Sequence, residues 1–524
     1  MTIFNLRGRA LVHVVTLMCS TSFLLFGYDN GVMSGLITSD QFYEVFPSLN
    51  GNSDLQGTVT SLLCIGSFFG SLLISGVGDR LGRRPCVLYG SIVVTLGVVI
   101  QTAAFSVAQM IVGRITTGFG LGMLTSTTPV YQSECSKAVH RGHDIGVELS
   151  TLIVGIVIAY WIDYGFAYLP HSISWRFPLA FQLVFIFILI VLAYFLPESP
   201  RWLLLHDRID EGLQVISDLR GLPCDDPDVI RERNEIMSFS GDDMSSQVSW
   251  KDLFLNGGIQ RGTRVGIACF GSMLQQLTGT NALTYYSTVI YEQNVGLSRH
   301  LSLLMGGFLQ LWFLASSIVT WYLIDRAGRR RLFLTGLTGM TICMAVLSAM
   351  IHTPGKGAGI IATIATFLFQ SFFTWGTMAN TWVYPSELLP LSARTKGAAL
   401  STATSWIFTY MVVQIVPVAA ANIGYRLYII FAALNASMCI FCYFFFPETA
   451  SLSLESVDML FIDSADKGIV SGLRQAVEKS LDVRSQYKGR HTEIDLQLNP
   501  TLKIEMVHQE YSDKNDLAQQ NSVV

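Results

Sequence analysis

Long apolar runs alternate with short polar clusters along most of this 524-residue chain. A helix needs roughly 20 predominantly apolar residues to cross a bilayer, and twelve runs reach that length. They predict transmembrane helices near residues 11–33, 56–77, 86–106, 109–131, 145–165, 176–196, 264–291, 301–324, 332–352, 358–384, 397–420 and 426–446. The pattern therefore predicts an all-α polytopic membrane protein.

The composition agrees with lipid as the solvent. Hydrophobic residues make up 51% of the chain and charged residues only 14%, whereas soluble domains carry about 25% charged residues. The nine cysteines lie mostly in the apolar runs and no two have metal-ligand spacing, so we expect neither a metal site nor a disulfide framework. The net charge of −4 gives no reason to expect a nucleic-acid partner.

The basic residues predict the orientation of the chain. Of its 34 Lys and Arg residues, 21 lie in the N-terminus and in alternate loops, and only 4 lie in the intervening loops. Basic loops remain on the cytoplasmic side of a membrane, so both termini are expected in the cytosol. We expect a multi-pass protein of the plasma membrane, in contact with lipid and functional as a monomer.

Three motif pairs indicate an internal duplication. They are Asp79–Arg84 with Asp325–Arg330, Val130–Glu134 with Val383–Glu387, and Pro197–Ser199 with Pro447–Thr449. Their offsets are 246, 253 and 250 positions, and each motif follows the corresponding span of its half. Parallel repeats of six helices are typical of transporters whose two halves rock around a central site.

The duplication divides the chain into five predicted segments. They are a cytosolic N-terminus at 1–10, a six-helix half at 11–202, a cytosolic linker with short helices at 203–261, a second six-helix half at 262–459 and a cytosolic tail at 460–524. The tail is polar and lacks periodicity, so we expect it to be disordered.

Charged residues gather where the spans meet the cytosol. Carboxylates at helix ends can pair there with arginines. Such pairs would form when the cytosolic ends of the two halves close together, and they would break when those ends open. Plain anchoring of the topology is the alternative. The candidate switch residues are Asp79, Arg80, Arg83, Arg84, Glu134, Arg141, Glu198, Arg201, Asp325, Arg326, Arg329, Arg330, Glu387 and Arg394.

Two ionisable residues lie deep in the first half, Asp29 in the first span and Arg114 in the fourth. A charge inside the bilayer is costly unless it is paired or faces water, so we expect the two to meet. Pairing and separation would change the proton affinity of the carboxylate, which makes Asp29 a candidate proton switch; a static ion pair is the alternative. Glu148 in the fifth span is a further candidate, facing a central cavity or the cytosolic interface.

The seventh span is too polar for contact with lipid. It carries amides at Gln275, Gln276 and Asn281, together with threonines and the tyrosine Tyr285. Amides donate and accept hydrogen bonds, which suits a neutral hydroxylated ligand. Gly279 in this span predicts a break in the helix, as in transporters with discontinuous helices at the binding site.

These motifs resemble those of the sugar porter family of the major facilitator superfamily, over nearly all of residues 8–460. The matching motifs are Gly27–Asp29, Gly78–Arg84, Pro197–Trp202, Gln275–Asn281, Asp325–Arg330 and Pro447–Thr449. The stretches from Gln132 to Asp163 and from Ser174 to Pro178 resemble the fungal branch that includes glycerol–proton symporters and hexose transporters. The resemblance implies the major facilitator fold, with twelve helices in two halves.

The resemblance also implies roles for individual residues. Asp29 and Arg114 would couple transport to a proton, and the ligand would contact Gln275, Gln276, Asn281, Trp382 and Trp406. Tyr285, Asn380 and Ser405 are further candidates for the ligand site. Hexose carriers of the family usually have Gln where this chain has Leu149, and Asn where it has Ser405. Each lost hydrogen bond is worth about 0.5–1.5 kcal/mol, so a smaller polyol is a serious candidate beside a monosaccharide.

The sequence thus predicts a carrier of a hexose, pentose or glycerol that works by alternating access. Proton symport is the first hypothesis, a hexose uniporter the second, and a non-transporting sugar sensor the third. No nucleophile–base, metal or phosphate-binding constellation is evident, so we expect neither an enzyme nor a cofactor other than the coupling proton.

Overall fold

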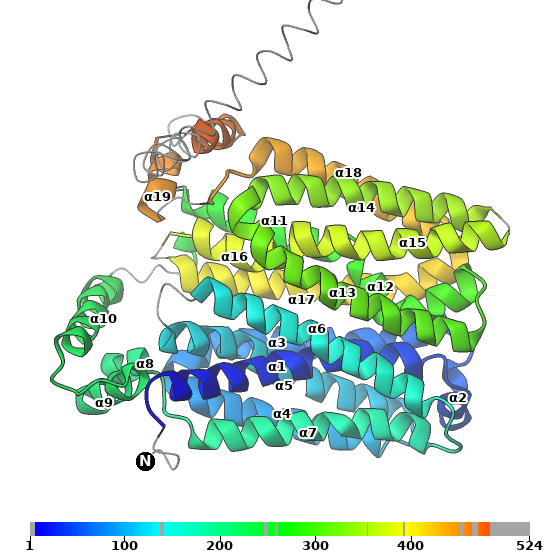
Figure 1. Ribbon diagram of the computed structural model, residues 1–524, viewed down its shortest axis with the longest axis horizontal. Helices are drawn as coiled ribbons and strands as arrows, with labels where there is room; N and C mark the ends of the chain where they lie inside the picture. The colour runs from blue at the N-terminus through cyan, green and yellow to red at the C-terminus, as the bar shows by residue number, and fades with distance from the viewer. Residues whose placement is uncertain are drawn as a thin grey trace, which may run out of the picture.

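Two layers of long helices make up the protein (Figure 1). The computed structural model describes residues 6–136, 141–245, 250–256, 260–353, 355–390, 393–450, 454–463 and 470–482. The first layer holds α1 (Arg9–Leu36), α3 (Ser53–Leu81), α4 (Arg83–Thr102), α5 (Val107–Cys135), α6 (Arg141–Phe166) and α7 (Ile173–Phe195). The second holds α11 (Arg261–Leu277), α12 (Thr280–Val289), α13 (Arg299–Ala327), α14 (Arg329–His352), α15 (Lys356–Phe373), α16 (Ala379–Leu388), α17 (Arg394–Ile423) and α18 (Arg426–Phe445).

The seventh span is discontinuous, as the sequence predicts. α11 ends at Leu277 and α12 begins at Thr280. Between them Gly279 has φ +93°, a left-handed conformation that favours glycine. A Cβ there would lie 3.0 Å from Phe431, so the glycine also allows close packing. Two short π-helical turns, Ile290–Asn294 and Thr374–Met378, interrupt the seventh and tenth spans further along.

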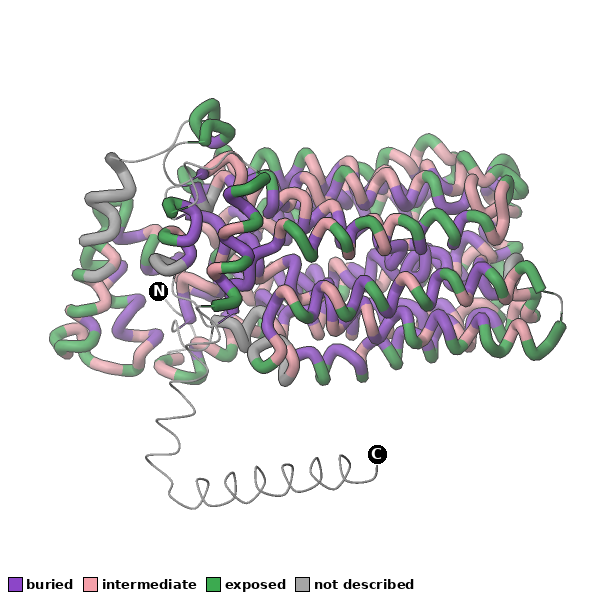
Figure 2. Tube along the Cα trace, turned by 90° about the horizontal axis from the view of Figure 1, so that it is seen from above, coloured by how far each residue is buried: buried purple, intermediate pink, exposed green. Residues whose placement is uncertain are grey.

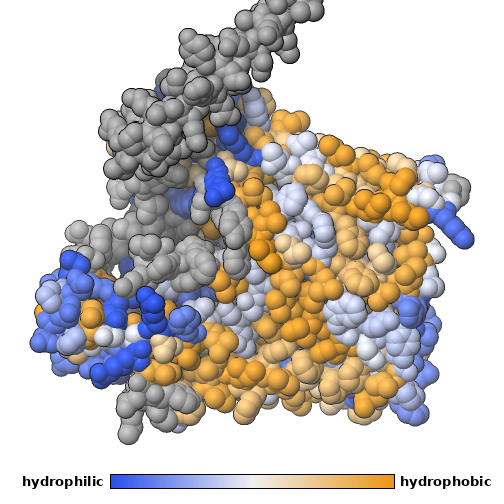
Figure 3. Space-filling model, in the orientation of Figure 1, coloured by the Kyte–Doolittle hydropathy of each residue, from blue (hydrophilic) through white to orange (hydrophobic). Residues whose placement is uncertain are grey.

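The predicted fold class is confirmed. Among the described residues, eleven helices are long and apolar enough to cross a membrane. The broken seventh span completes six crossings in each half. Figure 3 shows apolar side chains over the middle of the helices and hydrophilic ones toward the two ends, as a bilayer requires. Figure 2 shows that the buried positions follow the inward faces of the helices.

The short helices of the predicted linker lie together at one end of the helices (Figure 1). They are α8 (Pro200–Leu205), α9 (Ile209–Arg220) and α10 (Pro227–Ser245), followed by a 3-10 turn at Asp252–Phe254. We call this the linker end. The opposite end carries α2 (Asp40–Val45) and a 3-10 turn at Pro47–Leu49, and we call it the loop end.

The beginning of the predicted tail is folded, which corrects the expectation of disorder from residue 460. α19 (Leu454–Ile462) packs at the linker end, where Asp458 forms a 2.6 Å ion pair with Arg264 of α11. Residues 470–482 form a further helix with a buried apolar face that includes Leu473 and Ala476. That short amphipathic face is the signal that the polar composition concealed. Residues 483–524 lie outside the described part.

Glycines allow α1 and α6 to pack with their backbones almost in contact. Gly27, Gly31 and Gly35 recur every four residues and so share one face of α1. A Cβ at Gly27 would lie 1.8 Å from the carbonyl oxygen of Leu152, and one at Gly31 would lie 2.9 Å from the Cβ of Ala159. Small residues permit this close approach in a membrane.

Candidate functional site

Asp29 and Arg114 meet inside the first half, as predicted. Nη1 of Arg114 lies 3.1 and 3.2 Å from the two carboxylate oxygens of Asp29, and both side chains are fully buried. Nη2 of the arginine donates to the carbonyl of Thr60 at 3.2 Å. Removing one partner from such a pair leaves an uncompensated buried charge, so α1 and α5 are held together by this contact.

Gln182 of α7 lies beside Asp29, and no pattern in the sequence predicts it. Its side chain is completely buried, and the carboxyl group of Asp29 is the polar group that faces its amide. A buried amide without a good hydrogen bond is costly, so Gln182 is placed to respond when the carboxyl group of Asp29 changes its charge. A single glutamine in an apolar span carries no pattern that sequence reasoning could use.

The amides of the seventh span form a connected cluster with α17. Nε2 of Gln276 donates to the hydroxyl of Ser405 at 2.8 Å, and Nδ2 of Asn281 donates to Oε1 of Gln276 at 2.7 Å. Gln275 lies within 3.4 Å of Gln276. The structure thus brings Ser405 and the three amides to one place, around the break at Gly279.

Tyr285 links the amide cluster to the helix that carries the ion pair. Its hydroxyl donates to Oδ1 of Asn30 at 2.5 Å, across the interface between the halves. Asn30 follows Asp29 directly in α1, so a shift of that helix changes the hydrogen bond between Asn30 and Tyr285. Asn30 is a second residue that sequence reasoning missed, because its position beside Tyr285 depends on the pairing of distant helices.

Aromatic contacts also cross the interface. Phe23 of α1 packs edge-on against Trp382 of α16 with ring centroids 6.3 Å apart, and Phe26 packs against Trp406 of α17 at 5.3 Å. Both predicted tryptophans therefore face the other half. Rings in these positions can contact the apolar face of a sugar.

Asn380 of α16 uses its amide nitrogen within the second half. That nitrogen donates to the carbonyls of Gly376, at 2.7 Å, and Arg329, at 3.3 Å. It therefore ties the π-helical turn of the tenth span to α14. Its Oδ1 is buried without a hydrogen-bond partner in the described part of the chain, and its assignment to the ligand site stays a prediction.

Glu148 and Leu149 are both buried near the start of the fifth span. Glu148 is only 1% exposed and Leu149 is 5% exposed. The proposed cavity-facing role of Glu148 stays a prediction.

Hydrogen bonds join the two halves toward the loop end. Ser34 of α1 bonds Thr288 of α12 at 3.0 Å. Ser61 of α3 bonds Gln414 of α17 at 2.7 Å. Tyr160 of α6 donates to the carbonyl of Thr284 at 2.6 Å and lies 2.8 Å from the hydroxyl of Ser287. The structure is therefore closed at the loop end.

The charged motif of the first half forms a network at the linker end. Arg83 makes a two-pronged ion pair with Glu134, at 3.0 and 3.1 Å, and a bond of 2.9 Å to Asp79. Glu198 accepts the backbone amides of Arg83 at 2.9 Å and Ser199 at 2.8 Å. Burial raises the pKa of Glu198 above its ordinary value, although these amides oppose the shift.

The second half repeats the contacts of the arginine with both glutamates. Arg329 pairs with Glu387 at 2.9 Å, and Glu448 accepts its backbone amide at 2.9 Å. Burial raises the pKa of Glu387, against the opposing charge of Arg329. Gly82 and Gly328 both have φ +92°, which explains why each motif needs a glycine.

These networks correct one expectation, because the described pairs lie within each half and do not bridge the two. Arg84 and Arg330 bind backbone carbonyls of the last span of their own half, at Tyr194 and Tyr443. Arg80, Arg201 and Arg326 are exposed at the same end. The side chains of Arg141, Asp325 and Arg394 lie outside the described part.

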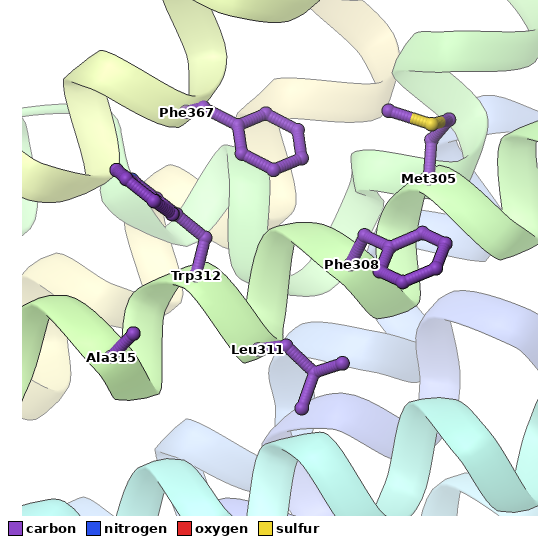
Figure 4. Close-up of a pocket in the computed structure, with 6 residues that line it drawn as sticks. All are labelled: Met305, Phe308, Leu311, Trp312, Ala315 and Phe367. Atoms are coloured by element: carbon purple, nitrogen blue, oxygen red, sulfur yellow. The ribbon is translucent and has the colours of Figure 1, made fainter.

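A separate apolar pocket of about 420 Å³ lies between α13 and α15 (Figure 4). It is lined by Met305, Phe308, Leu311, Trp312, Ala315 and Phe367. The indole N–H of Trp312 already donates to Ser371 at 2.8 Å, and Phe308 and Trp312 are each 44% exposed. The pocket suits hydrocarbon and does not suit a hydroxylated solute.

Comparisons with known proteins agree with this architecture. The family model described as "Sugar (and other) transporter" matches residues 14–461. The chain is 37% identical over 476 residues to the sugar transporter STL1 of Saccharomyces cerevisiae, covering 89% of this chain and 84% of that protein. It is 31% identical over 487 residues to a high-affinity glucose transporter of Kluyveromyces lactis, covering 86% and 85%.

Solved structures show the same fold. The proton:xylose symporter XylE superimposes with a TM-score of 0.72 at 23% identity, over 86% of this chain and 99% of that one. An inward open conformation of XylE from E. coli gives 0.71 at 22% identity, over the same shares of the two chains.

Proposed function

Because the chain belongs to the sugar transporter family, we propose that it carries a monosaccharide or polyol across the plasma membrane by proton symport. Alternating access between the two halves exposes the site to one side at a time. The linker end faces the cytosol, in agreement with its basic loops, and the loop end faces outward. The carrier works as a monomer.

One observation carries the coupling, namely the contacts that lead from Arg114 through α1 to Tyr285 of α12, the helix that also carries Asn281. Arg114 holds Asp29, and the next residue, Asn30, accepts a hydrogen bond from Tyr285. Tyr285 lies one helical turn beyond Asn281, so the two share a face of α12. Protonation of Asp29 weakens its pairing with Arg114 and frees α1 to move relative to the ligand-binding helix.

The amide cluster supports the substrate class. Gln275, Gln276 and Asn281 supply donors and acceptors, and Gln276 forms hydrogen bonds with Ser405 and Asn281. A hydroxylated solute can replace these bonds one for one, so exchange costs little. The similar proteins described above, a sugar transporter, a glucose transporter and a proton:xylose symporter, support the same class.

The charged networks support a role in the conformational cycle. Arg83 with Glu134, and Arg329 with Glu387, hold neighbouring helices of each half together at the linker end. These ion pairs make each half more rigid, so that it moves as one unit during alternating access. The ion pairs rearrange when the carrier opens and closes toward the cytosol.

Uptake of radiolabelled glycerol, glucose and xylose in a transporter-deficient host tests the proposal. We expect uptake of at least one solute, reduced by a protonophore, and a higher apparent KM in the Gln276→Ala variant. If the protonophore does not change uptake and the Asp29→Asn variant is fully active, the protein is a uniporter instead. If there is no uptake but the expression of other transporters changes, the protein is a sensor.

A further inference from the structure

A second carboxylate, Asp163 of α6, lies in the membrane with no cation beside it among the described residues. Its side chain is 4% exposed, no side chain in the described part hydrogen-bonds either carboxylate oxygen, and the group that faces them is the backbone amide of Gly35. This contrasts with Asp29, which is just as buried but bound by Arg114. An ionised carboxylate in this position would cost several kcal/mol, so the neutral acid is the form that the closed structure favours.

Gly27, Gly31 and Gly35 of α1 pack closely against α6, and we call this contact the glycine seam. Asp163 lies at its end nearest the loop end, against Gly35. A Cβ on Gly35 would lie 2.6 Å from the Cβ of Asp163 and 2.7 Å from its Oδ2. The carboxyl group therefore rests directly on the backbone of α1. The amide of Gly35 lies inside that helix, where it is already committed to the helical hydrogen bonds.

The other half covers this seam. Tyr160, one turn before Asp163 on α6, bonds Thr284 and Ser287 of α12. Ser34, next to Gly35, bonds Thr288. These are the bonds that close the loop end, so breaking them uncovers the face of α1 and α6 on which Asp163 lies. Water then reaches the carboxyl group, and the cost of ionising it falls.

The surrounding titratable groups offer no compensating charge. In the described part of the chain, Tyr28 of α1 and Tyr160 of α6 interact electrostatically with Asp163. The cations on the neighbouring helices are engaged elsewhere: Arg114 of α5 with Asp29, Arg299 of α13 with Asp40, His300 of α13 with Tyr164, and Arg176 of α7 with the carbonyls of Thr102 and Ala104.

We propose that Asp163 is a second proton-binding site, which takes up a proton from the outer medium as the loop end closes and returns it there when the loop end opens. The assignment of the loop end to the outside rests on the proposed function. The proton at Asp163 does not cross the membrane, because the group is sealed while the loop end is closed. It therefore makes closure depend on outside pH without adding to the number of protons transported.

Infrared difference spectra of the full-length protein in liposomes test the protonation directly. At neutral pH we expect wild type minus Asp163→Asn to show the carbonyl band of a protonated carboxylic acid. Asp163→Leu, which has the same number of side-chain heavy atoms and the same branching but no polar group, serves as a second variant. Asp54→Asn, which removes an exposed carboxylate at the same end, should remove carboxylate bands only. Loss of carboxylate bands alone in both Asp163 variants would overturn the proposal.

Exchange of radiolabelled glycerol and xylose tests whether Asp163 makes closure of the loop end depend on outside pH, a role that we call the gate. The Asp29→Asn background removes the proposed coupling proton, so any remaining dependence on outside pH belongs to other groups. We expect exchange to fall by about tenfold per unit of rising outside pH, the slope for one proton, and to become flat when Asp163→Asn is added. An unchanged slope in the double variant would refute the gate.

The two proposals fail separately. If the wild-type protein transports without a proton, the symport proposal is wrong. The infrared band and the dependence of exchange on outside pH still test whether Asp163 binds a proton. In the single Asp163→Asn variant the ratio of protons to solute stays as in the wild type; a lowered ratio would mean that Asp163 carries a transported proton and would contradict the gate.

Discussion

At the residue scale, the ion pair of Asp29 and Arg114 dominates the first half. Arg114→Gln leaves a buried carboxylate without its cation, and we expect a loss of about 3–5 kcal/mol in the free energy of unfolding. The double variant Asp29→Asn/Arg114→Gln should recover most of it, because neither charge remains. Thermal unfolding in detergent measures both, and a double variant no more stable than Arg114→Gln would contradict the account.

An exposed ion pair provides the matched control. Arg231 and Asp228 in the linker pair at 2.7 Å with side chains 68% and 64% exposed. Solvent screens such pairs, so Arg231→Gln should change the stability by less than about 1 kcal/mol.

Ser405 and Leu149 govern the choice of solute at the same scale. Ser405→Asn with Leu149→Gln restores two amides at the positions where hexose carriers have them. We expect the ratio of apparent affinities for glucose over glycerol to rise by roughly tenfold, since each added hydrogen bond is worth about 0.5–1.5 kcal/mol. Competition of unlabelled glucose against glycerol uptake measures the ratio, and an unchanged ratio would remove these positions from the site.

The sequence predicted the contacts of rare residues and missed those of common ones. Arg114 and Asp29 could be paired because few other charges lie in the spans of that half. Asn30 and Gln182 could not, because their partners depend on which helix faces lie together. The hydrogen bonds of Asn380 to the carbonyls of Gly376 and Arg329 could not be predicted for the same reason.

At the scale of the elements, glycines decide which helices can touch. A methyl group at Gly27 would overlap the carbonyl of Leu152, whereas one at Gly165 of α6 meets nothing within 4 Å. We expect Gly27→Ala to lower the free energy of unfolding by at least about 1–3 kcal/mol, as overpacking does. Gly165→Ala should be neutral or slightly stabilising. Similar melting temperatures of the two variants would contradict the packing of the seam.

The break in the seventh span was predictable because Gly279 stands among polar residues in an apolar context. The π-helical turns at Ile290–Asn294 and Thr374–Met378 were not. They arise from packing against neighbouring helices, and hydropathy does not carry that information. The helix at 470–482 was hidden for a different reason: its apolar face is short and lies in a polar segment.

At the scale of the whole molecule, the two halves repeat one design, and the sequence repeats predicted this well. Arg83→Gln removes the two-pronged pair with Glu134 but touches no ligand-binding residue. We expect kcat for uptake to fall by roughly tenfold, in line with the loss of a charged hydrogen bond, while KM stays within about twofold. Arg80→Gln, an exposed neighbour, should leave both constants unchanged. A changed KM with normal kcat would move Arg83 into the binding site.

Accumulation in proteoliposomes tests the central claim most directly. The purified protein is given radiolabelled glycerol or xylose with an acidic outside medium and a neutral interior. The account predicts that the wild-type protein concentrates one of these solutes inside, and that Asp29→Asn only equilibrates it. A wild-type protein that never exceeds equilibrium with either solute, or an Asp29→Asn variant that still accumulates the solute, would contradict proton symport through this carboxylate.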